Sequence, residues 1–276
     1  MFKKLIIINF SILISTASLF FSNTVLATSV DNVMSTYNQG DFANAFKLAK
    51  PLAESGDSAA QYLIGVMYVN GEGVTQDYKQ AYSWLIKSAE QGRGAAQFNL
   101  GMMYKRGNGV TQDNYTASKW FRKAADQNIS QAQFHLAYMF ETGNGVPQSI
   151  EEAIYWYTKA AEQGHLDAQF NLATLYKKNH PLQNFEKSVH FYKLAAAQGD
   201  WKAQSNLGVM YAQGLGTPQN NIKAYIWWSL AEELSGEDNY AAENLALLAK
   251  NLNSSQILET RKQAQKCRIN NYQDCD

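Results

Sequence analysis

Apolar residues recur at helical spacing in two short segments, residues 95–106 and 113–127. In the first segment the apolar positions follow the order i, i+4, i+7 and i+8, on one face of a helix: Ala96, Leu100, Met103 and Tyr104. The second segment combines small alanines with large aromatics in the same way. Small residues let two helices approach closely while aromatics fill the space beside them, so the pattern predicts a packed helical hairpin.

The hairpin pattern recurs along the chain with a period of 36 residues, shortened once to 35. The dipeptide Ala-Gln marks each copy, and its glutamines are Gln61, Gln97, Gln133, Gln169 and Gln204. One aromatic residue per copy forms a second column: Trp84, Trp120, Trp156, Phe191 and Trp227. Five copies in register predict an all-α repeat protein, and we expect the aromatic columns to form its core.

Polar and glycine residues punctuate the second helix of each copy. Good N-cap residues stand at its start: Asp41, Asp77, Asp113, Ser149, Asn184 and Asn220. Residues that accept a left-handed conformation follow its end: Gly56, Gly92, Asn128, Gly164, Gly199 and Gly236. Capping chemistry therefore bounds this helix six times.

The same columns divide the chain into parts. In chain order these are a short lead-in at 28–38, repeats at 39–240, a terminal helix pair at 241–267 and a tail at 268–276. Within the repeats, a half unit at 39–56 precedes five full units that begin at about residues 58, 94, 130, 166 and 201. The terminal pair ends in a charged helix that begins at a Ser254 N-cap, and its polar outer side suits the last element of an array.

The first residues of the chain have the layout of a secretory signal peptide. Lys3 and Lys4 give a positive start, residues 5–21 are apolar, and Val25 and Ala27 supply the small residues that a signal peptidase requires. We expect cleavage after Ala27, and the alternative is an uncleaved anchor. This leader predicts a periplasmic or secreted protein, with no integral membrane segment after cleavage.

The repeat unit reads A-x-x-x-L-G-x-x-Y-x-x-G-x-G-V-x-x-D-x-x-x-A-x-x-W-x-x-x-A-A-x-Q-G. This pattern resembles the Sel1-like repeat, a longer relative of the tetratricopeptide repeat, over residues 39–250. The resemblance implies a right-handed α-solenoid superhelix of antiparallel helix pairs. The fourth unit departs from the pattern, because "YKKNHPLQNF" lacks the Gly-x-Gly and one residue, so we expect a reshaped turn there.

The stretch "YKRGNGVTQD" at residues 104–113 holds a Gly-x-Gly, a pattern that cradles phosphate in some proteins. A phosphate loop follows a strand and opens onto a helix. Gly107 and Gly109 instead follow a helix, and the carbonyl end of a helix disfavours anions. We therefore expect a turn between two helices, in which Asp113 caps the second, and no bound cofactor.

The sequence contains no recognisable catalytic or metal-binding set. The four histidines form no ligand pair at helical spacing: His135, His165, His180 and His190. The chain has no G-x-S-x-G and no S-x-x-K, and Glu152 after Ser149 suits a capping box better than catalysis. Some Sel1-like proteins with a cysteine pair in every repeat are described as β-lactamases, but these repeats hold no cysteine.

The two cysteines, Cys267 and Cys275, both stand near the C-terminus. An exported chain meets an oxidising compartment, which favours a small terminal disulfide loop. The alternative is two free thiols on a frayed tail.

In tetratricopeptide-like solenoids the first helix of each unit lines a concave face that binds partners. On that helix, the positions outside the core columns form one stripe, with these candidate binding residues: Asn99, His135, Asn171, Asn206, Arg106, Lys178 and Tyr138. Asparagines of the stripe could bond a peptide backbone, as in tetratricopeptide relatives, with the two cations near an acidic group. Alternatively, they bond between adjacent helices and meet no ligand. Trp201, outside the columns, is a candidate exposed aromatic.

The chain has 24 Lys and Arg against 24 Asp and Glu, which argues against nucleic acid as a partner. The resemblance and the missing catalytic set predict an exported, non-enzymatic scaffold that binds a peptide or protein on its concave face. Its expected partners are envelope components or host proteins. The alternatives are a cell-envelope enzyme, β-lactamase-like or wall-modifying, and a peptidoglycan-associated structural protein.

Overall fold

The computed structural model describes residues 29–178, 180–235, 240–250, 252–270, 272 and 275. The expected signal peptide and its cleavage site after Ala27 lie outside the described residues, and so does Gly236. Within the described residues the chain forms fourteen α-helices and no strand. They are grouped in two compact units that divide between Gln148 and Ser149, and we describe each unit by itself.

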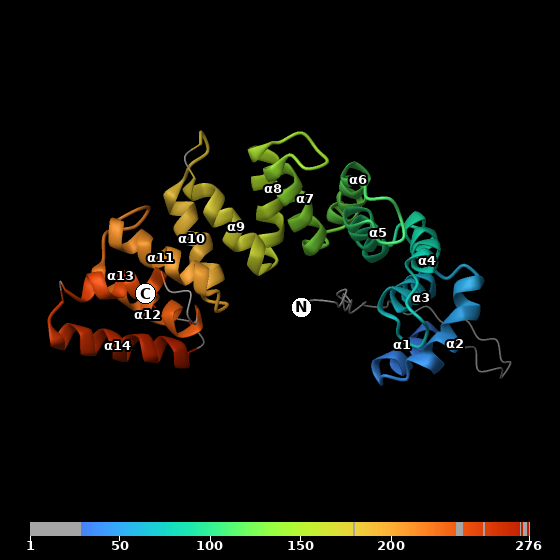
Figure 1. The fold of residues 1–276 in the computed structure, drawn as a ribbon, viewed down its shortest axis with the longest axis horizontal. Coiled ribbons are helices and arrows are strands. Elements are labelled where there is room, and N and C mark those ends of the chain that lie inside the picture. The colour runs from blue at the N-terminus through green and yellow to red at the C-terminus, as the bar shows by residue number, and fades with distance from the viewer. Residues whose placement is uncertain are drawn as a thin grey trace, which may run out of the picture. The chain divides into compact units, whose positions relative to one another are not determined.

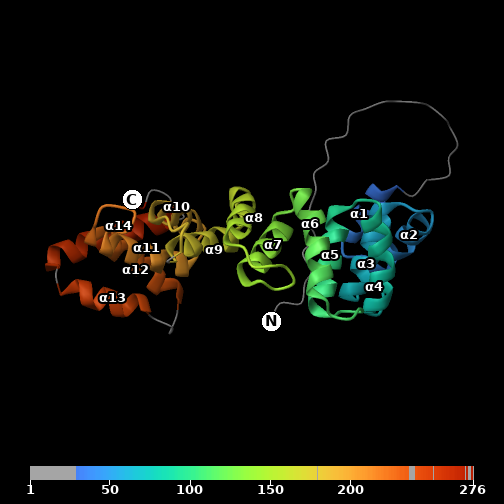
Figure 2. The same ribbon diagram turned by 90° about the horizontal axis from the view of Figure 1, so that it is seen from above.

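Unit 1 contains seven helices in sequence order: α1 (Val30–Asn38), α2 (Phe42–Glu54), α3 (Ser58–Asn70), α4 (Tyr78–Glu90), α5 (Gly94–Arg106), α6 (Asn114–Asp126) and α7 (Ser130–Thr142). Each helix packs on the next one along the chain, as the run from blue to green shows in Figures 1 and 2. We call the first helix of each repeat helix A and the second helix B. In this unit α3, α5 and α7 are A helices, and α2, α4 and α6 are B helices.

Unit 2 continues the alternation with seven more helices: α8 (Ile150–Glu162), α9 (Leu166–Lys177), α10 (Phe185–Ala196), α11 (Trp201–Gln213), α12 (Asn221–Ser235), α13 (Tyr240–Ala249) and α14 (Ser254–Ile269). Successive helices pack on one another up to α12, which contacts both α13 and α14. The fold is therefore an all-α repeat solenoid, as the sequence predicts.

Two element boundaries differ from the sequence predictions. The lead-in at 28–38 contains helix α1, which buries Val33 and Tyr37 against the next helices. The last helix takes its N-cap from Asn253 rather than from Ser254. The reason is a capping box, in which Asn253 accepts from the Gln256 N–H and its own N–H donates to the Gln256 side chain.

The predicted N-caps form at all six B helices, with Oδ or Oγ atoms accepting backbone N–H groups of the first turn: Asp41, Asp77, Asp113, Ser149, Asn184 and Asn220. The predicted left-handed residues after these helices also have positive φ wherever the structure describes them: Gly56, Gly92, Asn128, Gly164 and Gly199. Local capping chemistry thus fixes the ends of helix B, as the sequence indicates.

The Gly-x-Gly at 107–109 is a turn between α5 and α6. Both glycines have positive φ, 72° at Gly107 and 73° at Gly109. The second glycine also permits a close contact, because a Cβ there would lie 2.5 Å from the carbonyl oxygen of Tyr78, at the start of α4. The turn therefore joins two helices of one repeat and also packs on the preceding repeat, and Asp113 caps α6 as expected.

The fourth turn, which lacks the glycines, is closed by a histidine side chain. His180 Nδ1 accepts the Leu182 N–H at 3.0 Å, so its Nε2 carries the proton and donates to the Leu175 carbonyl at 2.7 Å. The backbone bond from the Asn184 N–H to the Tyr176 carbonyl, 2.9 Å, still joins the helix ends. The imidazole thus satisfies a terminal helix carbonyl where the other repeats use a left-handed glycine.

The core column of helix B lies one residue after the predicted aromatic column. Its members are buried in both units: Leu85, Phe121, Tyr157, Tyr192 and Trp228. Of the tryptophans expected to be core, Trp156 and Trp227 are buried, but Trp84 and Trp120 are only half-buried. Their outer faces carry lysine ammonium groups, each 4.4 Å from the ring centroid, so these two rings lie at the edge of the helix packing.

The Ala-Gln dipeptides place a buried glutamine in every repeat, and these glutamines connect successive helices. Gln97 of α5 donates from Nε2 to the Ala89 carbonyl in the last turn of α4, at 3.1 Å. Its Oε1 accepts from Nε2 of Gln127, the C-cap residue of α6, at 2.8 Å. Gln61 and Gln169 make the same two bonds in their own repeats. We call this series the glutamine ladder.

The fifth repeat keeps only the first of the two ladder bonds. Gln204 still donates to the Ala196 carbonyl at 3.2 Å, but its Oε1 is buried and has no hydrogen-bond partner in the described part of the chain. Helix α12, the B helix of that repeat, contains no glutamine to supply the second bond.

Candidate functional site

Helices α5 and α7 of unit 1 carry four of the seven candidate binding residues: Asn99, Arg106, His135 and Tyr138. We call these four residues, together with Lys105, the α5–α7 face. The two helices meet directly at this face, because the ring of Phe98 in α5 stacks on the His135 ring with centroids 5.9 Å apart.

Asn99 lies beneath the surface rather than on it. Its exposed fraction is 1%, and neither amide atom has a hydrogen-bond partner within the described residues. The amide approaches the Tyr62 hydroxyl without reaching hydrogen-bond geometry: burial raises the pKa of that hydroxyl, and the nearby amide partly offsets the rise. A buried amide without a bonded partner is costly, which makes Asn99 the one orphaned polar side chain of this face.

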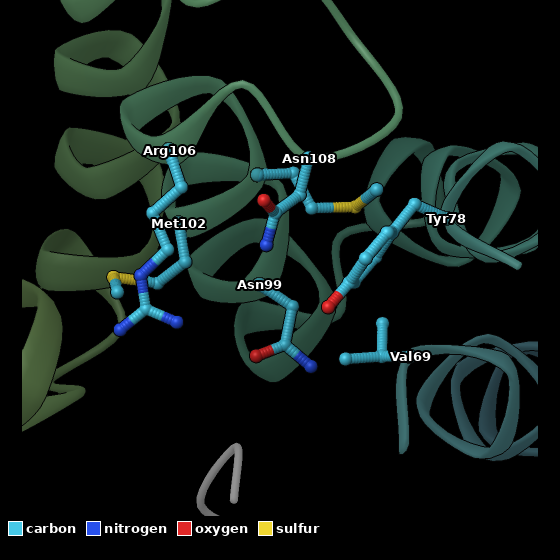
Figure 3. A pocket seen from close by; sticks show the side chains of 7 residues that line it. Val69, Tyr78, Asn99, Met102, Arg106 and Asn108 are labelled. Atoms are coloured by element: carbon cyan, nitrogen blue, oxygen red, sulfur yellow. The ribbon is translucent and has the colours of Figure 1, made fainter. Parts of the chain in front are cut away.

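Asn99 lines a small cavity together with Arg106 and Asn108. Figure 3 shows the two amides and the guanidinium around one space, with Met102 and Val69 at its sides. The cavity holds about 10 Å³, which is room for roughly one water molecule. It is too small to enclose a metabolite, so this site offers contacts to a surface rather than a chamber for a small substrate.

Lys105 and His135 join the two helices. The Lys105 ammonium lies 3.3 Å from His135 Nδ1, and the imidazole stacks on Phe121 with centroids 5.2 Å apart. Burial lowers the pKa of Lys105, and the positive charge of Arg106 adds to the lowering. His135 therefore serves inter-helix packing first, with its ring edge at the partly open side of the face.

Arg106 and Tyr138 are the exposed members of the face. Tyr138 is 42% exposed, and its ring centroid lies 5.8 Å from the Lys105 ammonium. Within the described residues neither Lys105 nor Arg106 forms an ion pair with a carboxylate. The arrangement offers two cations and one aromatic ring to an outside partner.

In unit 2 the candidate asparagines are bonded between neighbouring helices. Asn171 donates to the Tyr157 hydroxyl at 3.2 Å. Asn206 accepts from the Lys177 ammonium at 2.6 Å and donates to the Lys202 carbonyl at 2.9 Å. These contacts favour the alternative reading of the asparagine stripe, in which its members hold helices together.

The other two candidates of unit 2 lie at helix ends. Lys178 is exposed, as the C-cap residue of α9, and its backbone is extended. Trp201 begins α11 and is half-buried rather than exposed, with the Lys202 ammonium 5.6 Å from its ring centroid. Because part of the indole is covered, Trp201 is a weaker contact residue than its place outside the columns suggests.

Two lysines that the sequence did not single out connect the stripe. Lys105 and Lys177 occupy equivalent positions in the second and fourth repeats, and each reaches a stripe residue of the next helix A. Each contact joins residues about one repeat apart in sequence, so it forms only when the repeats are stacked. In the sequence, both lysines occupy the same repeat position, one residue before a predicted cation, and this shared position could have indicated them.

Cys267 and Cys275 form a disulfide that ties the tail to α14. Both cysteines are buried in the core cluster of unit 2. The tail also returns to the repeats, because Tyr272 packs against Gly199 after α10. The disulfide alternative is thus the one present in the structure.

Among the described residues, no cluster of three or more His, Cys, Asp or Glu side chains has the proximity to bind a metal ion. No helix in the same residues combines the length and hydropathy that a membrane span needs.

The Sel1 repeat family model matches the chain five times, at residues 58–92, 94–129, 130–165, 166–200 and 201–235. Among solved structures, a Sel1 repeat protein from Oxalobacter formigenes is 31% identical, with a TM-score of 0.69, over 79% of this chain and 86% of that one. A protective antigen of uropathogenic Escherichia coli with the SLR fold is 23% identical, with a TM-score of 0.44, over 88% of this chain and 76% of that one. No curated protein sequence matches the chain.

Sel1 repeats act generally in protein–protein interaction, and proteins built from them are typically non-catalytic. The matched repeats cover well over half of the chain, and the helix pairs follow the same period. The chain therefore belongs to the Sel1 repeat family.

Proposed function

We propose that this protein is an exported, non-enzymatic scaffold that binds a protein or peptide through the α5–α7 face. The supporting observation is the combination of Lys105, Arg106 and the 42% exposed Tyr138 on one face without a carboxylate partner in the described chain. Tyrosine and arginine side chains are enriched at protein interfaces. The small cavity beside them suits surface contact better than substrate turnover.

The proposed setting is the bacterial envelope or the contact between a bacterium and its host. The leader pattern of residues 1–27 supports export, and the Sel1 repeats support a partner-binding role. Cleavage after Ala27 is tested by N-terminal sequencing of the protein recovered from the periplasm and the medium. Recovery of the uncleaved chain from the membrane fraction alone would overturn cleavage and support the uncleaved anchor, whereas recovery from the cytoplasm alone would overturn the export proposal.

The binding role is tested by capture from envelope extract and, separately, from host lysate, with residues 28–276 as bait. A specific partner should be retained by the wild-type bait and lost with Tyr138→Ser. The matched control is Tyr115→Ser, which removes a 59% exposed tyrosine from helix B of the same unit. Loss of the partner with both variants, or with neither, would contradict binding at this face.

The enzyme alternative is tested on the same purified protein with nitrocefin and with muropeptides. We expect no multiple turnover of either. Turnover that survives purification and scales with protein concentration would overturn the scaffold proposal.

A further inference from the structure

The end of α5 concentrates two positive side chains that have no carboxylate partner in the described part of the chain. Lys105 and Arg106 are consecutive residues, and no carboxylate of the described chain forms an ion pair with either. The charge of Arg106 lowers the pKa of the half-buried Lys105, in addition to the effect of burial, so the two cations repel each other. The carbonyl end of α5 offsets part of this charge, and carboxylates bound by the two side chains, away from the helix end, would relieve the remaining repulsion.

The two cations project in different directions, so one anionic group does not suit both. Consecutive residues on a helix are about 100° apart around its axis. Lys105 reaches across to His135 of α7, whereas Arg106 lines the small cavity with Asn99 and Asn108 (Figure 3). Two carboxylates on one chain fit this arrangement better than a single terminal carboxylate.

The surroundings of the cations fit a peptide more than a small molecule. The cavity beside Arg106 has room for roughly one water, and Asn99 presents a buried amide to it without a bonded partner. A polar group of a bound chain could satisfy that amide, either directly or through a water. Tyr138, at the outer edge, supplies an aromatic surface next to the charges.

We propose that the α5–α7 face binds an extended acidic peptide segment of a partner protein, with one side-chain carboxylate at Arg106 and a second at Lys105. In an extended chain, residues two apart point to the same side, so the segment carries acids in an alternate pattern. An aromatic or aliphatic residue next to the acids would pack on Tyr138. This inference rests on the proposed scaffold function and specifies the chemistry of its partner.

The test uses fluorescence anisotropy with a fluorescein-labelled decapeptide that carries glutamates at positions 4 and 6 in a serine and glycine background with one leucine. Its matched probe replaces both glutamates with glutamine. We expect the glutamate probe to bind at least about tenfold more tightly than the glutamine probe. Its affinity should also fall as sodium chloride is raised from 50 mM to 500 mM, because Arg106 is exposed and Lys105 is only half-buried, so salt screens both charges.

The protein variants separate this face from general charge effects. Lys105→Glu with Arg106→Glu should weaken binding of the glutamate probe at least about tenfold. The control, Lys119→Glu with Lys123→Glu, makes the same charge change on exposed lysines of α6 and should leave affinity within about twofold. Circular dichroism checks that both double variants keep their helix content, and the milder Lys105→Gln with Arg106→Gln replaces any variant that unfolds.

The outcomes distinguish this inference from the scaffold proposal. Equal affinity for the two probes, or an equal loss in both double variants, would overturn acidic recognition at the α5–α7 face. If a partner captured by the wild-type bait is still retained by the Lys105 and Arg106 variant, the scaffold role stands and this inference fails. If no partner is captured while the probe binds as expected, acidic recognition stands and the scaffold role fails.

Discussion

The glutamine ladder makes a quantitative prediction about stability. Gln97→Met keeps an unbranched side chain of similar length but removes two hydrogen bonds, one to the Ala89 carbonyl and one from Gln127. A net hydrogen bond contributes about 1 kcal/mol, so the variant should lower the free energy of unfolding by about 2 kcal/mol. The Ala89 carbonyl also accepts a backbone N–H from Gly92, which limits the additional cost of leaving it without Gln97.

Gln204→Met is the matched control, because this glutamine makes only one of the two bonds and buries an unbonded oxygen. It should cost less than about 1 kcal/mol, since removing the orphaned oxygen offsets part of the lost bond. Urea unfolding followed by circular dichroism gives the two free energies, provided that the m-value is unchanged. Hydrogen exchange then locates the effect, which should be greatest in α4, α5 and α6 for Gln97→Met.

A double-mutant cycle isolates the bond between the two glutamines. Gln97→Met and Gln127→Met share one hydrogen bond, so their combined cost should be about 1 kcal/mol smaller than the total of the single costs. If the costs add without coupling, the bond between them contributes nothing measurable. If Gln204→Met destabilises as much as Gln97→Met, the ladder is irrelevant and only the polarity of the site matters.

Three further predictions concern the turns and the tail. Gly109→Ala should cost about 2–4 kcal/mol and Gly107→Ala about 1–2, because both glycines have positive φ but only a Cβ at Gly109 would clash with a neighbouring backbone. Equal urea midpoints for the two variants would contradict this order. Burial lowers the pKa of His165, the N-cap of α9, so its neutral form favours folding. The stability that this histidine contributes is fully present above its unfolded pKa of about 6.5 and is lost as the pH falls below that value. The free energy of unfolding of His165→Asn should therefore fall less than that of the wild type between pH 7.5 and 5.5. Equal decreases for the two proteins would refute this explanation. Reduction of Cys267–Cys275, whose positions differ by 8 residues, should cost about 2–3 kcal/mol and speed hydrogen exchange in α14, and unchanged exchange would show that the tail adds no stability.

The helices and their ends were predictable because the signals that define them are local. Asp113 caps the helix that follows it, and Gly107 turns the chain, using atoms within a few residues. Each capping signal is weak alone, but it recurs at the same position in successive repeats, and this recurrence supports the assignment of every copy. Helix α1 was missed because it lies before the first repeat and buries only Val33 and Tyr37, which is too few positions to establish a period.

The site was less predictable because its contacts connect different repeats. The sequence placed Asn99 on an open stripe, but the structure buries it. Lys105, whose ammonium meets His135 thirty positions later, was also not singled out from the sequence. Sequence spacing shows which residues share a helix face, whereas the depth of that face depends on how the next helix stacks against it.

The Ala-Gln columns illustrate the same limit. Their period revealed the fold, but the reason for glutamine appeared only with the bonds at both ends of Gln97. The Gln97 amide donates to helix B of the preceding repeat and accepts from the C-cap residue of helix B in its own repeat. This arrangement involves three helices, so the sequence of one helix cannot reveal it.

The glutamine ladder also indicates where the repeats of this chain can tolerate a change of length. Each ladder glutamine lies eight residues after the carbonyl that it binds, in all five repeats from Gln61 to Gln204. The loop from helix B to the next helix A therefore has a fixed length. The fourth repeat is one residue shorter in the loop from helix A to helix B, where His180 closes the turn. The eight-residue spacing of the ladder bonds on either side of this loop is unchanged. Insertions and deletions should accumulate between helix A and helix B, whereas whole repeats can be duplicated without altering a single ladder bond.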